Sequence, residues 1–481
     1  MGFVISIDAG TTGVRAFVID ESGRPVAVAY REFPQYFPQP GWVEHDANEI
    51  WDAVQACLAE VATYQPVAAV GITNQRETVV VWSRATGEPL HRALVWQDRR
   101  TADVCAALLD HLSTVRAKTG LVLDPYFSAT KLKWLLDRVD APRDDVMVGT
   151  IDTWLLWKLT GTYATDVTNA SRTLLCDIGT RRWDDDLMEL FGVTGVTLPE
   201  IRPSSGRLGV TADGVPVSGI AGDQQAALFG QACFSPGMTK NTYGTGSFVL
   251  MNVGPDMPAP VEGLLTTVGW ELASGATAYA LEGAIFVTGA AIQWLRDGLG
   301  LIEAAPEIGP LAGSVADTDG VFVVPAFTGL GSPWWDPYAR GAIVGITRGT
   351  TKAHIARAVV ESMVLSTRDV VDAMCAAAGR EVTTLRVDGG ASVMDLLCQM
   401  QADQLQVPVE RPAITETTAL GAAYLAGLAE GVWSSTDELA ALWSREAAWR
   451  PQVPKELADL RLEQWHNAVE RSRHWADVAA E

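Results

Sequence analysis

The chain has 481 residues, of which 48% are hydrophobic and 20% are charged. That length exceeds one ordinary hydrophobic core, so we expect a compact globular protein of two or three domains and no extended disorder. The 58 Asp and Glu residues outnumber the 36 Lys and Arg residues, and the net charge is −22. Such a surface repels nucleic acids and anionic membranes, so neither is an expected partner. A polyanionic ligand would need local cations or a metal ion.

The six cysteines are scattered without a CxxC pair, and the six histidines do not cluster. This spacing favours buried free thiols in a reducing compartment over a zinc site. No apolar run approaches the roughly eighteen residues of a membrane span, and the first residues do not resemble a secretory signal. The sequence therefore predicts a cytoplasmic protein without a membrane span.

The chain opens with apolar segments separated by small residues. Residues 3–8, 14–20 and 26–33 are expected to form strands, followed by a helix over 47–63 and a strand over 67–73. The first two strands enclose the turn in "DAGTTGVRAFVID". One interpretation is an ordinary glycine-rich hairpin. The other is a phosphate-binding turn, in which successive backbone N–H groups and threonine hydroxyls surround an anion.

The second half begins in the same way. Residues 238–254 predict strand, Gly-Thr turn and strand, and residues 276–286 predict the next strand. The repetition indicates an internal duplication. A third glycine turn, within residues 385–405, is expected to lead from a strand directly into an amphipathic helix, whose N-terminal dipole would favour an anion. The pattern is neither a Walker loop nor a GxGxxG motif.

Asp8 ends the first predicted strand beside the first turn. A carboxylate next to phosphates repels them unless a divalent cation lies between, so Asp8 is a candidate Mg²⁺ partner through water. An Asx-turn role explains the residue equally well.

Long blocks of the chain resemble the FGGY carbohydrate kinases. They include "GWVEHD" (41–46), "NQRET" (74–78), "VWQDRRT" (95–101), "DPYFSATK" (124–131), "GIAGDQQAALFGQ" (219–231), "KNTYGTGSF" (240–248), "ALEGAIF" (280–286) and "ETTALGAAYLAGL" (416–428). The resemblance implies an α/β fold of two actin-like (ribonuclease H-like) domains, residues 1–236 and 237–481, that flank a cleft for nucleotide and substrate. It also implies ATP and Mg²⁺ as cofactors, and we expect a homo-oligomer, either a dimer or a tetramer.

Asp223 stands where a helix is expected to begin, which is a favoured position for a capping aspartate. The resemblance instead implies a general base that accepts the proton of the attacking substrate hydroxyl. Gln224 would hold another hydroxyl of the substrate.

The family's polyol site maps onto Arg76, Glu77, Trp96, Tyr126, Asp223, Gln224 and Phe248. Aromatic walls around a few polar groups suit a small polyol. Taken alone, the polar loop at 74–77 is explained better by solvent exposure than by binding, and the aromatic residues can be explained by core packing. The nucleotide contacts map onto Thr11, Thr12, Gly13, Arg15, Thr245, Gly289, Gln293, Gly390 and Met394.

The chain departs from the family pattern in two places, the first turn and position 394. The first turn usually reads Asp-Gln-Gly-Thr-Thr-Ser-Ser-Arg, whereas residues 8–15 read Asp-Ala-Gly-Thr-Thr-Gly-Val-Arg. A serine hydroxyl directed at the γ-phosphate is thus absent at Gly13, although the backbone N–H remains. Met394 replaces an asparagine near the adenine, and a thioether packs on a purine without reading its edge. We expect weaker or less selective nucleotide binding.

The activity that the resemblance implies is ATP-dependent phosphorylation of glycerol to sn-glycerol 3-phosphate. One alternative keeps the chemistry with another short polyol or a ketose, such as erythritol, dihydroxyacetone or xylulose. A second alternative is a non-catalytic nucleotide-binding regulator, which the presence of Asp223 and the lack of a visible helix-turn-helix extension disfavour.

Overall fold

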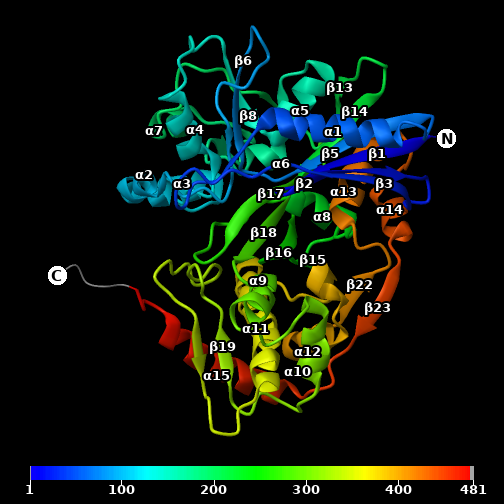
Figure 1. The fold of residues 1–481 in the computed structure, drawn as a ribbon. Helices are drawn as coiled ribbons and strands as arrows, with labels where there is room; N and C mark the ends of the chain where they lie inside the picture. Colours follow the sequence, from blue (N-terminus) through cyan, green and yellow to red (C-terminus); the bar gives the residue numbers. More distant parts are fainter. Residues whose placement is uncertain (1, 477–481) are drawn as a thin grey trace.

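The computed structural model describes residues 2–476, which form two lobes that each contain a mixed β-sheet (Figure 1). The first lobe comprises β1 (Phe3–Ala9), β2 (Gly13–Ile19), β3 (Pro25–Glu32), β4 (Glu44–His45), α1 (Ala47–Val61), β5 (Val67–Asn74), β6 (Val79–Ser83), β7 (Ala93–Leu94), α2 (Ala102–Ala107), α3 (Leu112–Thr119), α4 (Ser128–Leu136), β8 (Val146–Thr150), α5 (Ile151–Thr160), β9 (Ala164–Asp166), α6 (Val167–Ala170), β10 (Cys176–Asp177), β11 (Arg182–Trp183), α7 (Asp185–Leu190), β12 (Glu200–Arg202), β13 (Ser205–Val210), β14 (Pro216–Gly222) and α8 (Asp223–Gly230).

The rest of the chain contains β15 (Thr239–Tyr243), β16 (Ser247–Gly254), β17 (Leu265–Glu271), β18 (Thr277–Ile285), α9 (Gly289–Gln293), α10 (Ile308–Gly313), β19 (Phe322–Val324), β20 (Ala342–Val344), α11 (Lys352–Ala378), β21 (Leu385–Asp388), the 3₁₀ helix η4 (Gly390–Val393), α12 (Asp395–Leu405), β22 (Val409–Pro412), α13 (Thr417–Ala429), α14 (Thr436–Leu442), β23 (Arg445–Trp449) and α15 (Lys455–Ser472).

The two large sheets share one topology. The first has the strand order β13-β14-β5-β1-β2-β3, with β1 antiparallel to β2 and parallel to β5. The second has the order β17-β18-β16-β15-β21-β22-β23, with β15 antiparallel to β16 and parallel to β21. In each lobe the first two strands form a hairpin, and the first strand lies at the centre of the sheet. This common order confirms the internal duplication and the two-domain α/β fold.

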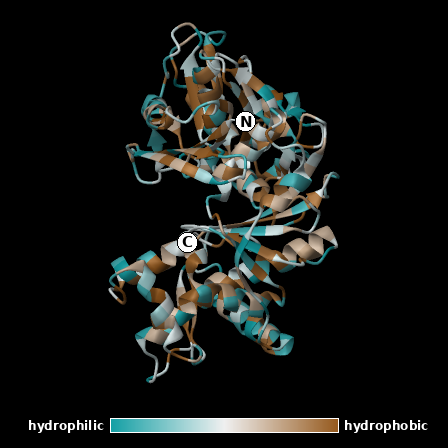
Figure 2. Cartoon of the chain, turned by 90° about the vertical axis from the view of Figure 1, so that its right-hand side faces the viewer, coloured by the Kyte–Doolittle hydropathy of each residue, from teal (hydrophilic) through white to brown (hydrophobic). Residues whose placement is uncertain are grey.

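Local signals explain where several elements begin and end. The Asp46 side chain accepts a hydrogen bond from the backbone N–H of Asn48 and caps α1. Helix α11 begins at a capping box formed by Thr351 and His354 and ends at Gly379, whose φ of 59° is left-handed. Apolar residues gather inside both lobes, and hydrophilic residues lie on the outside (Figure 2).

Helices α8 and α13 cross at very short range between the two sheets (Figure 1). A Cβ added at Gly421 of α13 would lie 1.8 Å from the carbonyl oxygen of Ala226 in α8. A Cβ at Gly230 of α8 would lie 1.9 Å from the carbonyl oxygen of Thr417. Glycine is required here because backbone meets backbone. Helix α13 also packs on the first sheet through β14, β5 and β1, although in the sequence it lies between β22 and β23 of the second sheet.

The expected strands and the helix of the first 75 residues are confirmed within two residues of their ends, and the free thiols are buried except for the half-buried Cys375. The expectation for the third glycine turn was wrong. Gly389 has a φ of 83°, and the 3₁₀ helix η4 separates β21 from α12. The extended backbone of Met394 then stops η4 before α12 begins, so the N-terminus of α12 does not open directly from the turn. Within residues 2–476, no helix combines the length and the apolar character that a bilayer span requires.

The close helix crossing gives a stability prediction. Replacing Gly421 with Ala places a methyl group inside a backbone contact, and we expect a loss of about 1–3 kcal/mol or more in the free energy of unfolding. Urea denaturation followed by circular dichroism measures the loss. Gly313→Ala is the matched control, because a Cβ there meets nothing within 4 Å at an ordinary φ, and we expect a change within about 0.5 kcal/mol. Equal stabilities for the two variants would contradict the prediction.

Candidate active site

The loop after β5 lies beside the first glycine turn because of the sheet register. Asn74, the last residue of β5, pairs with Ala9 of β1 on one side and with Gly222 of β14 on the other. The backbone N–H of Gln75 donates to the carbonyl oxygen of Ala9 at 2.9 Å. Three parallel strands therefore end together, and the residues that follow them share one edge of the sheet.

Arg76 is the centre of this edge, and its side chain is only 2% exposed. Its guanidinium group donates two hydrogen bonds to the carboxylate of Glu282 in β18, at 2.5 and 3.0 Å. A third goes to the hydroxyl of Tyr126 at 2.9 Å. Its Nε lies 3.3 Å from Oδ1 of Asp223. Arg76 thus connects the first lobe with the second sheet.

Two further residues complete a buried charge cluster. Arg172 donates from Nε to Oε1 of Glu77 at 2.8 Å and from Nη2 to Oε1 of Glu282 at 3.0 Å. We call Arg76, Glu77, Arg172 and Glu282 the arginine–glutamate cluster. Two cations balance two carboxylates, as burial in a low dielectric requires. Burial alone would raise the pKa of Glu282, but Arg172 and Arg76 outweigh it and lower the pKa to about 2.

Asp223 is the first residue of α8, and its side chain is 35% exposed. Gly222 occupies the N-cap position, and no side chain caps the helix. Among residues 2–476, the Asp223 carboxylate accepts a hydrogen bond from the adjacent N–H of Gln224, at 2.7 Å, and forms an ion pair with Arg76. Burial raises the pKa of Asp223, while Arg76 lowers it and Glu77 raises it further. Asp223 is therefore not the N-cap residue of α8, although its Oδ1 accepts a first-turn N–H of that helix.

Lys240 is a buried cation beside Asp223 that the sequence analysis did not single out. Its Nζ donates to Oε1 of Gln224 at 2.5 Å and to Oγ1 of Thr242 at 2.8 Å. Desolvation lowers the pKa of Lys240 to about 8, although the nearby carboxylates of Asp388 and Asp223 oppose the shift. Lys240 fixes the orientation of the Gln224 amide and adds positive charge next to the candidate base.

Aromatic side chains border the same space. The rings of Trp96 and Tyr126 meet edge to face at 5.6 Å, and the Arg76 guanidinium lies 5.8 Å from the ring centre of Phe248. Trp96 also donates from its indole Nε1 to Oγ1 of Thr11 at 3.0 Å. This bond joins the candidate polyol residues to the first glycine turn. All seven predicted substrate residues are therefore linked by contacts that the structure contains.

The first turn carries Asp8 at its start and Arg15 at its end, paired across the β1–β2 hairpin. Burial raises the pKa of Asp8 to about 6, Arg15 lowers it, and the charges of Asp223 and Glu416 raise it. Arg15 donates to the Glu416 carboxylate at 2.9 Å, a contact from the first lobe to the start of α13.

The second and third turns meet in the other lobe. The carbonyl oxygen of Thr245 accepts the N–H groups of Thr288 and Ala290, which fixes the second turn to the start of α9. Gly289 lies so close that a Cβ there would be 2.5 Å from the carbonyl oxygen of Gly244. A Cβ at Gly389, the residue before Gly390, would be 2.5 Å from the carbonyl oxygen of Tyr243.

Two of the residues predicted to contact the nucleotide lie in or beside helices of the second lobe. Gln293 is the last residue of α9. The Met394 side chain lies 3.3 Å from the Cβ position of Gly309 in α10. The structure therefore groups Thr245, Gly289, Gln293, Gly390 and Met394 in the second lobe, and Thr11, Thr12, Gly13 and Arg15 in the first.

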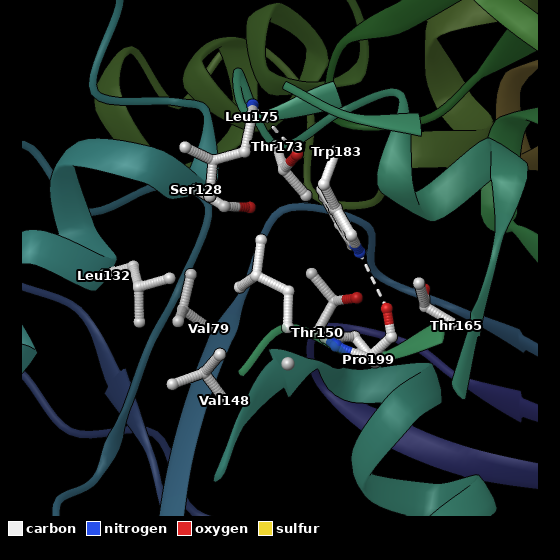
Figure 3. A pocket seen from close by; sticks show the side chains of 12 residues that line it. Val79, Ser128, Leu132, Val148, Thr150, Thr165, Thr173, Leu175, Trp183 and Pro199 are labelled. Atoms are coloured by element: carbon white, nitrogen blue, oxygen red, sulfur yellow. Dashed lines mark hydrogen bonds between the residues drawn. The ribbon is translucent and has the colours of Figure 1, made fainter. Parts of the chain in front are cut away.

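The small cavity in Figure 3 is a different feature. Its volume is about 30 Å³, and its lining includes Leu132, Val148 and Trp183. The indole of Trp183 closes one side by donating to the carbonyl oxygen of Pro199 at 2.7 Å. No predicted site residue lines this cavity, which has room for about one water molecule and not for a polyol.

Residues 3–230 match the N-terminal domain, and residues 239–430 the C-terminal domain, of the FGGY family of carbohydrate kinases. The chain therefore belongs to the FGGY family of carbohydrate kinases. It is 53% identical to the glycerol kinase of Bordetella parapertussis, over 99% of this chain and 98% of the relative. It is also 53% identical to the glycerol kinase of Geobacillus kaustophilus, over 97% and 98%. The crystal structure of Plasmodium falciparum glycerol kinase with ADP superposes with a TM-score of 0.93 at 35% identity, covering 98% of each chain.

The arginine–glutamate cluster gives a second stability prediction. Glu282→Gln leaves Arg76 and Arg172 short of one negative charge in the interior, and we expect a loss of about 3–5 kcal/mol in the free energy of unfolding at pH 7. Because the folded-state pKa of Glu282 is depressed below the ordinary 4.5, its contribution is present above pH 4.5 and is lost as the pH falls towards 2.

Urea denaturation at a series of pH values checks both statements. The loss should shrink progressively below pH 4.5. Glu60→Gln is the control, because its ion pair with Arg31 is about half exposed on both sides, and we expect less than about 1 kcal/mol. A Glu282→Gln variant as stable as Glu60→Gln would contradict the buried role of the cluster.

Proposed function

We propose that this protein transfers the terminal phosphoryl group of ATP to glycerol and releases ADP and sn-glycerol 3-phosphate. The observation that carries the proposal is the Asp223 carboxylate, ion-paired with Arg76 beside Tyr126 and Phe248. Full-length similarity to glycerol kinases supports the choice of substrate. The Plasmodium glycerol kinase crystallised with ADP, which supports an adenine nucleotide as the phosphoryl donor.

In the proposed reaction, a glycerol hydroxyl attacks the terminal phosphorus of ATP. The Asp223 carboxylate accepts the hydroxyl proton while the new O–P bond forms. The bond from that phosphorus to its bridging oxygen breaks, and ADP leaves. Arg76, Tyr126 and Gln224 hold the remaining hydroxyls of the polyol, and Trp96 and Phe248 pack against its carbon chain. The backbone N–H groups of the turns hold the phosphates.

Asp8 fits a role in holding Mg²⁺ through water. Burial raises the pKa of its half-buried carboxylate, and the negative charge of Asp223 raises it further. A cation beside Asp8 would oppose both effects. Mg²⁺ commonly uses one or two carboxylates together with phosphate oxygens and water, and when bound it offsets the charge of the phosphates. Asp8 would keep this position fixed through its place in the central strand β1.

We also propose that the protein is cytoplasmic and forms a dimer or a tetramer. In addition, we propose that Met394 lowers the selectivity for the nucleotide base. The cysteines, buried apart from the half-buried Cys375, suit a reducing compartment. Light scattering measures the oligomeric state, and competition between ATP and GTP measures the selectivity.

An ADP-release assay with Mg-ATP tests the reaction and its substrate. Glycerol should be preferred over dihydroxyacetone, erythritol, xylitol and xylulose, and Asp223→Asn should lower kcat at least about a hundredfold because the base is lost. Asp103→Asn, at an exposed aspartate of α2, is the control and should retain full activity. Preference for another polyol would contradict the proposed substrate but not the proposed mechanism. ATP binding without any turnover would favour a regulator.

The pH dependence of kcat/KM provides an independent check. Asp223 must be ionised to accept a proton, and its pKa is raised above the ordinary 3.8. We therefore expect kcat/KM to fall on the acidic side at a higher pH than an unperturbed aspartate would give. Initial rates between pH 3 and pH 8 measure the profile. An acidic limb at or below pH 3.8 would contradict this assignment.

A further inference from the structure

Gly13 in the first turn is a glycine for lack of space. Its φ lies outside the left-handed region, so the backbone conformation suits any residue. A Cβ at this position would lie 2.6 Å from Cε2 of Tyr30 and 2.7 Å from the carbonyl oxygen of Arg31. Both atoms belong to β3, which pairs with β2. The ring of Tyr30 therefore occupies the space that a side chain at position 13 would need.

The hydroxyl of Tyr30 reaches the same turn. It lies 2.9 Å from the Cβ position of Gly13. Burial and the Glu32 carboxylate raise the pKa of Tyr30, although a hydrogen bond with the Thr12 side chain opposes the shift. The Arg15 guanidinium lies 6.0 Å from the ring centre. One hydroxyl thus lies among Thr12, Gly13 and Arg15, all of which are predicted to contact the nucleotide.

Tyr30 is also free to act on a ligand. Its side chain is 43% exposed, although it stands in a strand. The hydroxyl donates to Oε1 of Glu32 at 3.3 Å, which is long for an O–H donor. Rotation about the C–O bond redirects the hydrogen without moving the ring. The raised pKa keeps the proton on the oxygen at neutral pH, so the group remains a donor.

We propose that the Tyr30 hydroxyl donates a hydrogen bond to the terminal phosphate of bound ATP, in place of the side-chain hydroxyl that Gly13 lacks. The proposal rests on the proposed function, because it places the phosphates of ATP at the first turn. Tyr30 is then a positioning residue for the phosphoryl donor. The two residues are complementary: Gly13 has no side chain, and the ring of Tyr30 occupies the space that such a side chain would need.

Tyr30→Phe tests the proposal, because it keeps the ring and removes only the hydroxyl. The affinities for ADP and for a non-hydrolysable ATP analogue are measured by calorimetry in the presence of Mg²⁺, together with KM for ATP and for glycerol. We expect the affinity for the ATP analogue to fall roughly ten- to a hundredfold, as for the loss of one hydrogen bond to a charged acceptor. KM for ATP should rise by a similar factor. The affinity for ADP and KM for glycerol should change less than about twofold.

Tyr338→Phe is the matched control, since it removes an exposed tyrosine hydroxyl from the other lobe, and all four quantities should stay at the wild-type values. An unchanged affinity of Tyr30→Phe for the ATP analogue would overturn the role of Tyr30. A parallel fall for ADP and the ATP analogue would also overturn it, since it would indicate a structural effect on the whole turn. Failure of the wild-type protein to phosphorylate glycerol would count against the proposed function alone, because the two affinities still report on Tyr30.

Discussion

The structure depends on a balance of charge in the interior. Arg76 and Arg172 are at most 2% exposed, and each needs a carboxylate partner to offset the cost of leaving water. Glu282 accepts hydrogen bonds from both arginines, and Glu77 accepts one from Arg172. These contacts tie the loop after β5 to the segment after α6 and to β18 of the second sheet. Removing any one of the four charges leaves the cluster with one unbalanced charge in the interior.

This balance also prepares the site for chemistry. Because the Arg76 guanidinium is held by Glu282 and Tyr126, its Nε is directed at Asp223 and not at solvent. Asp223 therefore experiences two opposed influences on its pKa, burial and the arginine. Lys240 adds a second buried cation nearby. In a chain of net charge −22, such local cations are the means by which a highly charged anion can be accepted.

The duplicated sheets explain why the turns lie where they do. In each lobe the first glycine turn joins the central strand to its antiparallel neighbour, so its backbone N–H groups emerge at the end of the sheet. Helices α8 and α13 cross between the lobes, and Gly230 and Gly421 allow the two backbones to touch. The two turns are consequently held on opposite sides of a tight, glycine-dependent contact. Their placement follows from strand order and helix packing together.

Local patterns in the sequence were enough to predict the first strands, α1 and the repeated strand–turn–strand unit. Hydrophobic alternation and turn residues act over a few neighbours, so they can be read without the fold. The third turn was misjudged, because the left-handed Gly389 and the extended Met394 are set by contact with Tyr243 and α10. The resemblance to the FGGY family supplied the predicted site residues, because the chain shares those residues with the family. It gave no role to Glu282, Lys240 or Tyr30.

Those three residues show what only the tertiary structure decided. Each stands in a strand, and the sequence contains the signal that Glu282 and Lys240 are charged residues within otherwise apolar or uncharged strands. The sequence does not show which residue each of these charged side chains will contact. Glu282 meets Arg76 across 206 residues of chain, and Lys240 meets Gln224 in another element. By itself the sequence determined the strands, the turns and the residue types that the chemistry needs. The tertiary structure decided which charges neutralise one another and which side chain fills the space at Gly13. Both depend on contacts between strands, because only folding brings those atoms within hydrogen-bond distance.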